Sequence, residues 1–147
     1  MSTGYILIVE DADLVRGALC ARLEKEGYQV SGARTVTEAL GALRTRMPDV
    51  IILDLTVIDE ADPLSGMSDG FVVMRVLRLN YPEANPGIII YTVNNSPKVE
   101  SRAKAMGAVA VIEKTSGIQT LLRVIREALD QRNTAPPGSV ATPPAIA

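Results

Sequence analysis

The sequence predicts an α/β domain built on a parallel five-stranded sheet. Short apolar runs rich in β-branched residues alternate along the chain with segments whose apolar residues recur at helical spacing. The short runs are continuously apolar, as in strands that are covered on both faces. A length of 147 residues suits one domain of five strand–helix units and is too short for an eightfold barrel.

The first strand is expected at Tyr5–Val9 (YILIV) and the second at Tyr28–Ala33. The helix between them carries an apolar stripe and ends at Gly27, which follows a charged last turn. The helix after the second strand carries another stripe, with Thr35 or Thr37 as its candidate N-cap. The two stripes are Leu14 or Val15, Leu19 and Leu23, and then Val36, Ala39, Leu40 and Leu43.

Three further units complete the pattern. The remaining strands are expected at Val50–Asp54, Gly87–Thr92 and Val109–Ile112. One helix is expected at Phe71–Leu79, and a short one begins with Ser96 as cap and Pro97 in its first turn and ends near Gly107. The last helix carries a strong apolar stripe of Ile118, Leu121, Leu122, Ile125 and Leu129.

The C-terminal stretch differs in composition from the rest of the chain. Residues 133–147 (NTAPPGSVATPPAIA) carry no charge and hold four of the nine prolines. We expect this stretch, from Asn133 on, to be a flexible Pro-rich tail that does not continue the last helix. The folded domain is then expected to span residues 4–132.

Composition narrows the classes of function. The chain has no His, which excludes histidine-based catalytic triads, imidazole proton transfer and His-ligated zinc. Its one cysteine, Cys20, is expected to be a small apolar residue in a reducing compartment. A net charge of −2 and few aromatic rings predict no nucleic-acid partner. No run approaches the roughly 18 apolar residues of a membrane span, so we expect a soluble, cytoplasmic protein.

Polar side chains end four of the five predicted strands. Glu10 and Asp11 follow the first strand, Asp54 ends the third, Thr92 ends the fourth, and Lys114 follows the fifth. In an open parallel sheet, ligands bind outside the carboxyl ends of the strands. Asp11 alone would more often cap a helix, but Asp54 is harder to explain in this way because Leu53 and Leu55 flank it and Asp is depleted in strands. Their joint occurrence at one edge indicates a functional site.

The predicted chemistry follows from the acidic residues. Neighbouring strands lie about 4.8 Å apart, so Glu10, Asp11 and Asp54 would converge if the first and third strands are neighbours. Three like charges repel unless they protonate or a cation neutralises them, and oxygen ligands favour a hard ion such as Mg²⁺. With a Lys and a Thr hydroxyl nearby, the set predicts phosphoryl transfer with a carboxylate nucleophile and an aspartyl phosphate product.

These motifs resemble the receiver domain of two-component response regulators. They are Glu10-Asp11, Asp54 in VIILD, Thr92 in IIIYT and Lys114 in VIEK, and the resemblance covers about residues 4–132. The separations of 43 residues (54 minus 11) and 22 residues (114 minus 92) are typical of that family. The resemblance implies a flavodoxin-like (βα)5 three-layer sandwich with the parallel strand order 2-1-3-4-5.

The resemblance also implies roles for the site residues. Asp54 would accept a phosphoryl group from a sensor histidine kinase or a phosphotransfer protein. Glu10, Asp11, Asp54 and the backbone carbonyl of Thr56 would bind Mg²⁺, and Lys114 would contact the phosphoryl group.

The expected output is a change in a protein-interaction surface. Thr92 would be the switch hydroxyl, which moves toward the phosphate and repacks the surface of the fourth helix, fifth strand and fifth helix. We expect a stand-alone receiver that acts on an unidentified downstream protein, as a monomer or weak homodimer. Its chemistry would be limited to its own phosphorylation and dephosphorylation, so we do not expect an enzyme.

The chain departs from the family pattern between the acceptor and Gly70. Leu55–Asp69 contains an insertion with additional acidic residues. One interpretation is a tolerated surface excursion, which we favour because loops accept insertions at low cost. The other is a lid or a partner-specific contact beside Asp54.

Three single positions also depart from the pattern. Val111 stands where the family often has an aromatic residue, so the switch cannot be a swinging ring. Thr115 replaces a Pro after Lys114, and because a cis bond before Thr costs about 2.5–4 kcal/mol, we expect a trans peptide. Val93 replaces a small residue after the switch threonine and is expected to slow labelling by small phosphodonors.

Two other functions stay open. A receiver-like adaptor that does not need phosphorylation would fit the divergent switch positions, although the complete set of acidic, hydroxyl and lysine residues argues against it. A phosphatase of the haloacid dehalogenase type is suggested by Asp54-Leu55-Thr56, which is similar to the nucleophile motif of that family. The phosphatase is less favoured because Asp54 ends the third strand, not the first.

Overall fold

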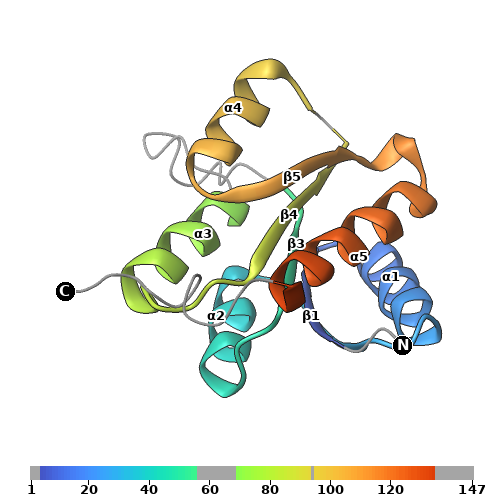
Figure 1. The fold of residues 1–147 in the computed structure, drawn as a ribbon, viewed down its shortest axis with the longest axis horizontal. Helices are drawn as coiled ribbons and strands as arrows, with labels where there is room; N and C mark the ends of the chain where they lie inside the picture. The colour runs from blue at the N-terminus through green and yellow to red at the C-terminus, as the bar shows by residue number, and fades with distance from the viewer. Residues whose placement is uncertain (1–3, 56–68, 94, 135–147) are drawn as a thin grey trace.

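The fold is a single parallel sheet with helices on both faces (Figure 1). It is seen in a computed structural model that describes residues 4–55, 69–93 and 95–134. No helix in this part of the chain is long and apolar enough to cross a membrane.

The five strands lie in the predicted order, β2-β1-β3-β4-β5, and all neighbours pair in parallel. Their bounds are β1 (Tyr5–Val9), β2 (Gln29–Ala33), β3 (Val50–Leu53), β4 (Gly87–Thr92) and β5 (Ala108–Glu113). The central strands β1, β3 and β4 are buried along their whole length, which accounts for their continuous apolar sequences.

Five helices follow the five strands. They are α1 (Asp13–Lys25), α2 (Val36–Thr45), α3 (Asp69–Asn80), α4 (Pro97–Ala105) and α5 (Ile118–Thr134), with a short 3₁₀ turn at Lys114–Ser116. Two of the predicted caps are confirmed: the hydroxyl of Thr35 accepts from the N–H of Glu38, and that of Ser96 accepts from the N–H of Val99.

The predicted end of the last helix was too early. Helix α5 includes Asn133 and Thr134, the first two residues of the expected tail. Proline restricts the residue before it and removes its own N–H, so Pro136 does not prevent Asn133 and Thr134 from completing a turn. The rest of the expected tail lies outside the described residues.

The two faces of the sheet have separate cores. Helices α1 and α5 cover one face, where Ile6 and Ile125 are fully buried, and α2, α3 and α4 cover the other, where Leu7 and Met74 are fully buried (Figure 1). Alternate residues of β1 therefore face opposite cores, as the strand period requires. This packing fixes the strand ends on which the polar residues lie.

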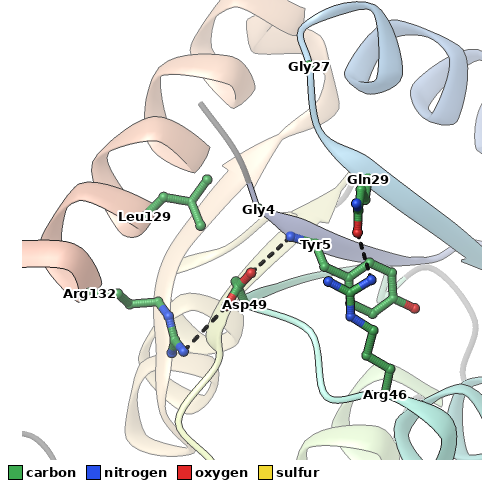
Figure 2. Close-up of a pocket in the computed structure, with 8 residues that line it drawn as sticks. All are labelled: Gly4, Tyr5, Gly27, Gln29, Arg46, Asp49, Leu129 and Arg132. Carbon is green, nitrogen blue, oxygen red and sulfur yellow. Dashed lines mark hydrogen bonds and ion pairs between the residues drawn. The ribbon is translucent and has the colours of Figure 1, made fainter. Parts of the chain in front are cut away.

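At the amino edge of the sheet, Asp49 joins three strands and α5 (Figure 2). Its backbone N–H donates to Tyr5 O at 2.8 Å, and its carbonyl accepts from the N–H of Gly87 at 2.9 Å. Its side-chain Oδ2 accepts from the N–H of Tyr5 at 2.9 Å, while Arg132 approaches Oδ1 at 3.7 Å. Tyr5, Asp49 and Arg132 border a cavity of about 380 Å³. Arg46 also borders it, with its guanidinium carbon 4.3 Å from the centre of the Tyr5 ring.

Replacing Asp49 with Ala is expected to lower the free energy of unfolding by about 1–3 kcal/mol, because the N–H of Tyr5 loses its acceptor. The variant Arg132→Gln removes a half-exposed ion pair from the same carboxylate and an exposed hydrogen bond to the carbonyl of Asn85, and it is expected to cost about 0–1 kcal/mol. Urea denaturation followed by circular dichroism measures both values. Equal destabilisation by the two variants would contradict this account.

Candidate functional site

Three carboxylates meet at the carboxyl edge of the sheet, as predicted. Glu10 and Asp11 follow β1, Asp54 follows β3, and one oxygen of each lies within 4.8 Å of the others. The backbone sets this convergence, since Val9 pairs with Leu53 and the N–H of Asp54 donates to Val9 O at 3.1 Å. Asp54 was predicted as the last residue of its strand, and it lies one residue beyond β3.

The three carboxylates differ in their exposure to water. Glu10 is 3% exposed, Asp11 is exposed, and Asp54 is intermediate. Burial raises the pKa of Glu10 above its ordinary value, and hydrogen bonds from Lys114 and from the N–H of Ala12 partly oppose that rise. The ionised form of Glu10 is therefore costly in the folded protein even with Lys114 beside it, and a further cation would stabilise that form.

Lys114, which follows β5, places one positive charge beside these carboxylates. Its Nζ donates to Glu10 Oε1 at 2.6 Å and to Asp54 Oδ2 at 3.0 Å, across 104 and 60 residues of sequence. Burial works to lower the pKa of Lys114, but the hydrogen bonds to Glu10 and Asp54 outweigh it, so the pKa is raised. Lys114 thus stays protonated and joins the two acidic strand ends to the end of β5.

Thr92 lies at the same edge. It is the last residue of β4, pairs in register with Glu113 of β5, and is 1% exposed. The structure therefore places five predicted site residues at one end of the sheet: Glu10, Asp11, Asp54, Thr92 and Lys114. The sixth, Thr56, lies outside the described residues, as does most of the predicted insertion.

Gly70, in the first turn of α3, allows a close approach to Asp54. A Cβ at this position would lie 2.4 Å from Leu55 Cδ2 and 3.1 Å from the carbonyl oxygen of Asp54. The first distance is too short for two carbons, so the side chain of Leu55 would have to move, and the second is a tight approach to the backbone. A side chain at position 70 would therefore displace the side chain of Leu55 and press on the carbonyl of Asp54.

Arg16 was not predicted as part of the site. Its Nη1 donates to the carbonyl oxygen of Glu10 at 2.8 Å, and its Nη2 donates to Asp13 Oδ1 at 2.6 Å. An Arg on an amphipathic helix gives no sequence signal for a contact with a backbone carbonyl. The sequence signal that was available is the i, i+3 spacing of Asp13 and Arg16, which is typical of an ion pair on one helix.

The departures from the family pattern have visible structural counterparts. No described peptide bond is cis, which confirms the trans bond predicted between Lys114 and Thr115. The segment after Lys114 forms the 3₁₀ turn. Val111 is partly buried against the core under α2, α3 and α4, and Val93 is 50% exposed beside Thr92.

The donor set suits a hard divalent cation. Three ionised carboxylates and one ammonium leave two negative charges (three minus one) in a small volume. Every candidate ligand atom is an oxygen, which Mg²⁺ prefers, and Asp11 is open to solvent so that a bound ion could keep water ligands. The residues present therefore fit Mg²⁺.

The solved structures most similar to this one include receiver domains. The chain matches the receiver domain protein (CheY-like) from Methanospirillum hungatei JF-1 with a TM-score of 0.76 and 26% identity, over 90% of this chain and 98% of that one. It also matches the BeF3-activated receiver domain of Klebsiella pneumoniae RstA with a TM-score of 0.71 and 26% identity, over 85% and 97% of the two chains.

Two of the similar curated proteins are regulators that are longer than this chain. The transcriptional regulatory protein YkoG of Bacillus subtilis (strain 168) is 33% identical, over 91% of this chain and 54% of YkoG. The KDP operon regulator KdpE of Escherichia coli (strain K12) is 32% identical, over 89% of this chain and 54% of KdpE. The chain thus spans about half the length of these relatives.

The family described as the response regulator receiver domain matches residues 6–126, which include every described residue of the acidic site. Receiver domains bind Mg²⁺ through acidic residues of this kind and interact with sensor kinases or phosphotransfer proteins. The strand order, the carboxylates at the ends of β1 and β3, and this match agree: the chain belongs to the receiver domain family of two-component response regulators.

Proposed function

We propose that this protein is a Mg²⁺-dependent phosphoacceptor whose Asp54 takes a phosphoryl group from the phosphohistidine of a sensor kinase or phosphotransfer protein. One observation carries the proposal: the carboxylate of Asp54 lies within 4.8 Å of Glu10 and Asp11 and 3.0 Å from the Nζ of Lys114. A nucleophilic carboxylate between a hard-cation site and a fixed ammonium is suited to phosphoryl transfer.

The transfer exchanges one bond to phosphorus for another. An oxygen of Asp54 attacks, the P–O bond forms, and the P–N bond to the donor imidazole breaks. Glu10, Asp11 and Asp54 would hold the Mg²⁺, with the carbonyl of Thr56 as a further ligand by resemblance to the family. The bound ion would supply charge stabilisation for the phosphoryl oxygens.

Lys114 and Thr92 would act after the attack begins. Lys114 already contacts Asp54 at 3.0 Å, so it can stabilise negative charge on the arriving phosphoryl group without a large movement. The hydroxyl of Thr92 would donate a hydrogen bond to an oxygen of the phosphoryl group, and Thr92 would move toward that group. Since Val111 is small and partly buried, the response of β5 would be a repacking of the core, not the rotation of an aromatic ring.

The output would be a protein contact. YkoG and KdpE are named as transcriptional regulators, whereas the receiver domain proposed here would bind a protein target by its α4–β5–α5 surface. That this chain acts alone, as a monomer or weak homodimer in the cytoplasm and without turnover of a separate substrate, remains a prediction.

Incubation with Mg²⁺ and acetyl phosphate is expected to add one phosphoryl group to the wild-type chain and none to the variant Asp54→Asn. The reason is that the amide is not a nucleophile toward phosphorus. Intact-mass spectrometry measures the addition. Asp49→Asn, the same change at the other edge of the sheet, is the matched control and should label like wild type. If Asp54→Asn is labelled as much as wild type, Asp54 is not the acceptor. If neither small phosphodonors nor kinases label the wild-type chain, the adaptor function is favoured.

Without Mg²⁺, the variant Glu10→Gln is expected to gain stability relative to wild type as the pH rises. The folded pKa of Glu10 is raised, so its contribution to stability is full below the ordinary value of about 4.3 and is lost as the pH rises through the raised pKa. Thermal unfolding from pH 4 to pH 8 measures the difference. Saturating Mg²⁺ should stabilise wild type more than the variant, and a difference that does not change with pH would contradict this prediction.

The variant Val93→Ala is expected to label faster with acetyl phosphate than wild type, because a smaller side chain beside Thr92 widens access to Asp54. Val109→Ala is the control, since Val109 is also about half exposed but lies on β5 before the site. Initial labelling rates at equal donor concentration measure the effect. Unchanged rates for Val93→Ala would show that position 93 does not limit access.

A further inference from the structure

Arg16 binds both ends of the segment that carries Asp11. The carbonyl oxygen of Glu10 accepts from Nη1 at 2.8 Å, and the carboxylate of Asp13 accepts from Nη2 at 2.6 Å. The planar guanidinium holds its donors in a fixed fork, so two bonds to one side chain also fix the distance between the two acceptors. The path of residues 10–13, with Asp11 between the two attachment points, is thus set by one side chain.

The other bonds of this segment agree with such a role. The N–H of Glu10 donates to Ala33 O at 3.0 Å, and the carboxylate of Glu10 accepts from the N–H of Ala12 at 3.1 Å. These bonds hold the backbone on the β2 side and at the start of α1. Arg16 adds the bond to the carbonyl of Glu10, the residue that links the buried strand to the exposed Asp11.

Gly32 on β2 provides the space for the stem of Arg16. A Cβ at position 32 would lie 3.0 Å from Arg16 Cδ and 3.2 Å from Arg16 Cγ. The Arg16 side chain is only 21% exposed, although it lies on the first turns of a surface helix. Because the stem is confined against a backbone that has no side chain, the guanidinium has a defined position.

We propose that Arg16, seated on Gly32, is a positioning residue for the Mg²⁺ site, which holds the 10–13 segment so that Asp11 faces the ion. This inference rests on the proposed function, because it concerns the same metal site. Arg16 contacts neither the ion nor the phosphoryl group. It acts through the backbone of Glu10 and through Asp13, in the way that outer residues orient the ligands of other metal sites.

Positioning and simple electrostatics predict opposite effects when the charge is removed. A positive charge near a Mg²⁺ site repels the ion, so Coulomb's law alone predicts that Arg16→Gln binds Mg²⁺ more tightly. If Arg16 positions Asp11, the variant binds Mg²⁺ more weakly, by a factor on the order of 10. The sign of the change therefore separates the two roles.

The test is titration of the full chain with Mg²⁺ alone by calorimetry, with thermal unfolding in the absence of the ion as a check on the fold. Arg16→Gln should weaken binding, and Arg16→Lys should recover only part of it, because an ammonium lacks the fork. Arg22→Gln is the matched control: it removes the same charge from α1, where Arg22 pairs with Glu26 at 3.3 Å, and should leave Mg²⁺ affinity unchanged.

A second variant changes Gly32, against which the Arg16 stem packs, and keeps Arg16 itself. Gly32→Val puts a branched side chain where the Arg16 stem lies and should weaken Mg²⁺ binding. The double variant Arg16→Gln with Gly32→Val should bind Mg²⁺ no more weakly than Arg16→Gln alone. Unchanged or tighter binding by Arg16→Gln, or unchanged binding by Gly32→Val if the former does not fold, overturns the proposal. If the wild type itself does not bind Mg²⁺, both this inference and the proposed Mg²⁺-dependent function are overturned.

Discussion

The repulsion among three carboxylates at the ends of β1 and β3 is the constraint on which the rest of the site depends. The parallel register forces Glu10, Asp11 and Asp54 together, because Val9 lies opposite Leu53 and the next backbone bond joins Asp54 to Val9. The fold opposes the resulting repulsion with Lys114, the first residue after β5. The site is thereby left with excess negative charge and with affinity for a divalent cation.

The apolar sheet makes this arrangement stable. Both faces of the central strands are covered, by α1 and α5 on one side and by three helices on the other, so the strand ends have little freedom to move apart. Close approaches at Gly70 and Gly32 then bring helices α3 and α1 against the acidic residues. The charged edge is therefore a consequence of packing that is almost entirely apolar.

Most of the fold and most of the site could be predicted from the sequence. Continuous apolar strands and helical stripes define elements by local pattern, and acidic residues at strand ends mark the edge where they meet. The end of α5 was missed because proline affects only its immediate neighbours. Arg16 was missed because its partner is a backbone carbonyl, and the packing of its aliphatic stem against a glycine of β2 depends on three-dimensional contacts that no residue pattern encodes.

The position of Lys114 has a consequence for protein synthesis. The last carboxylate of the site is Asp54, but the amine of Lys114 that balances its charge lies 60 residues later, in the 3₁₀ turn after β5. A nascent chain that has emerged from the ribosome only through β4 carries Asp54 without its counter-charge. The charge-balanced form of this site can therefore exist only after β5 and the turn that follows it have been translated and have joined the sheet.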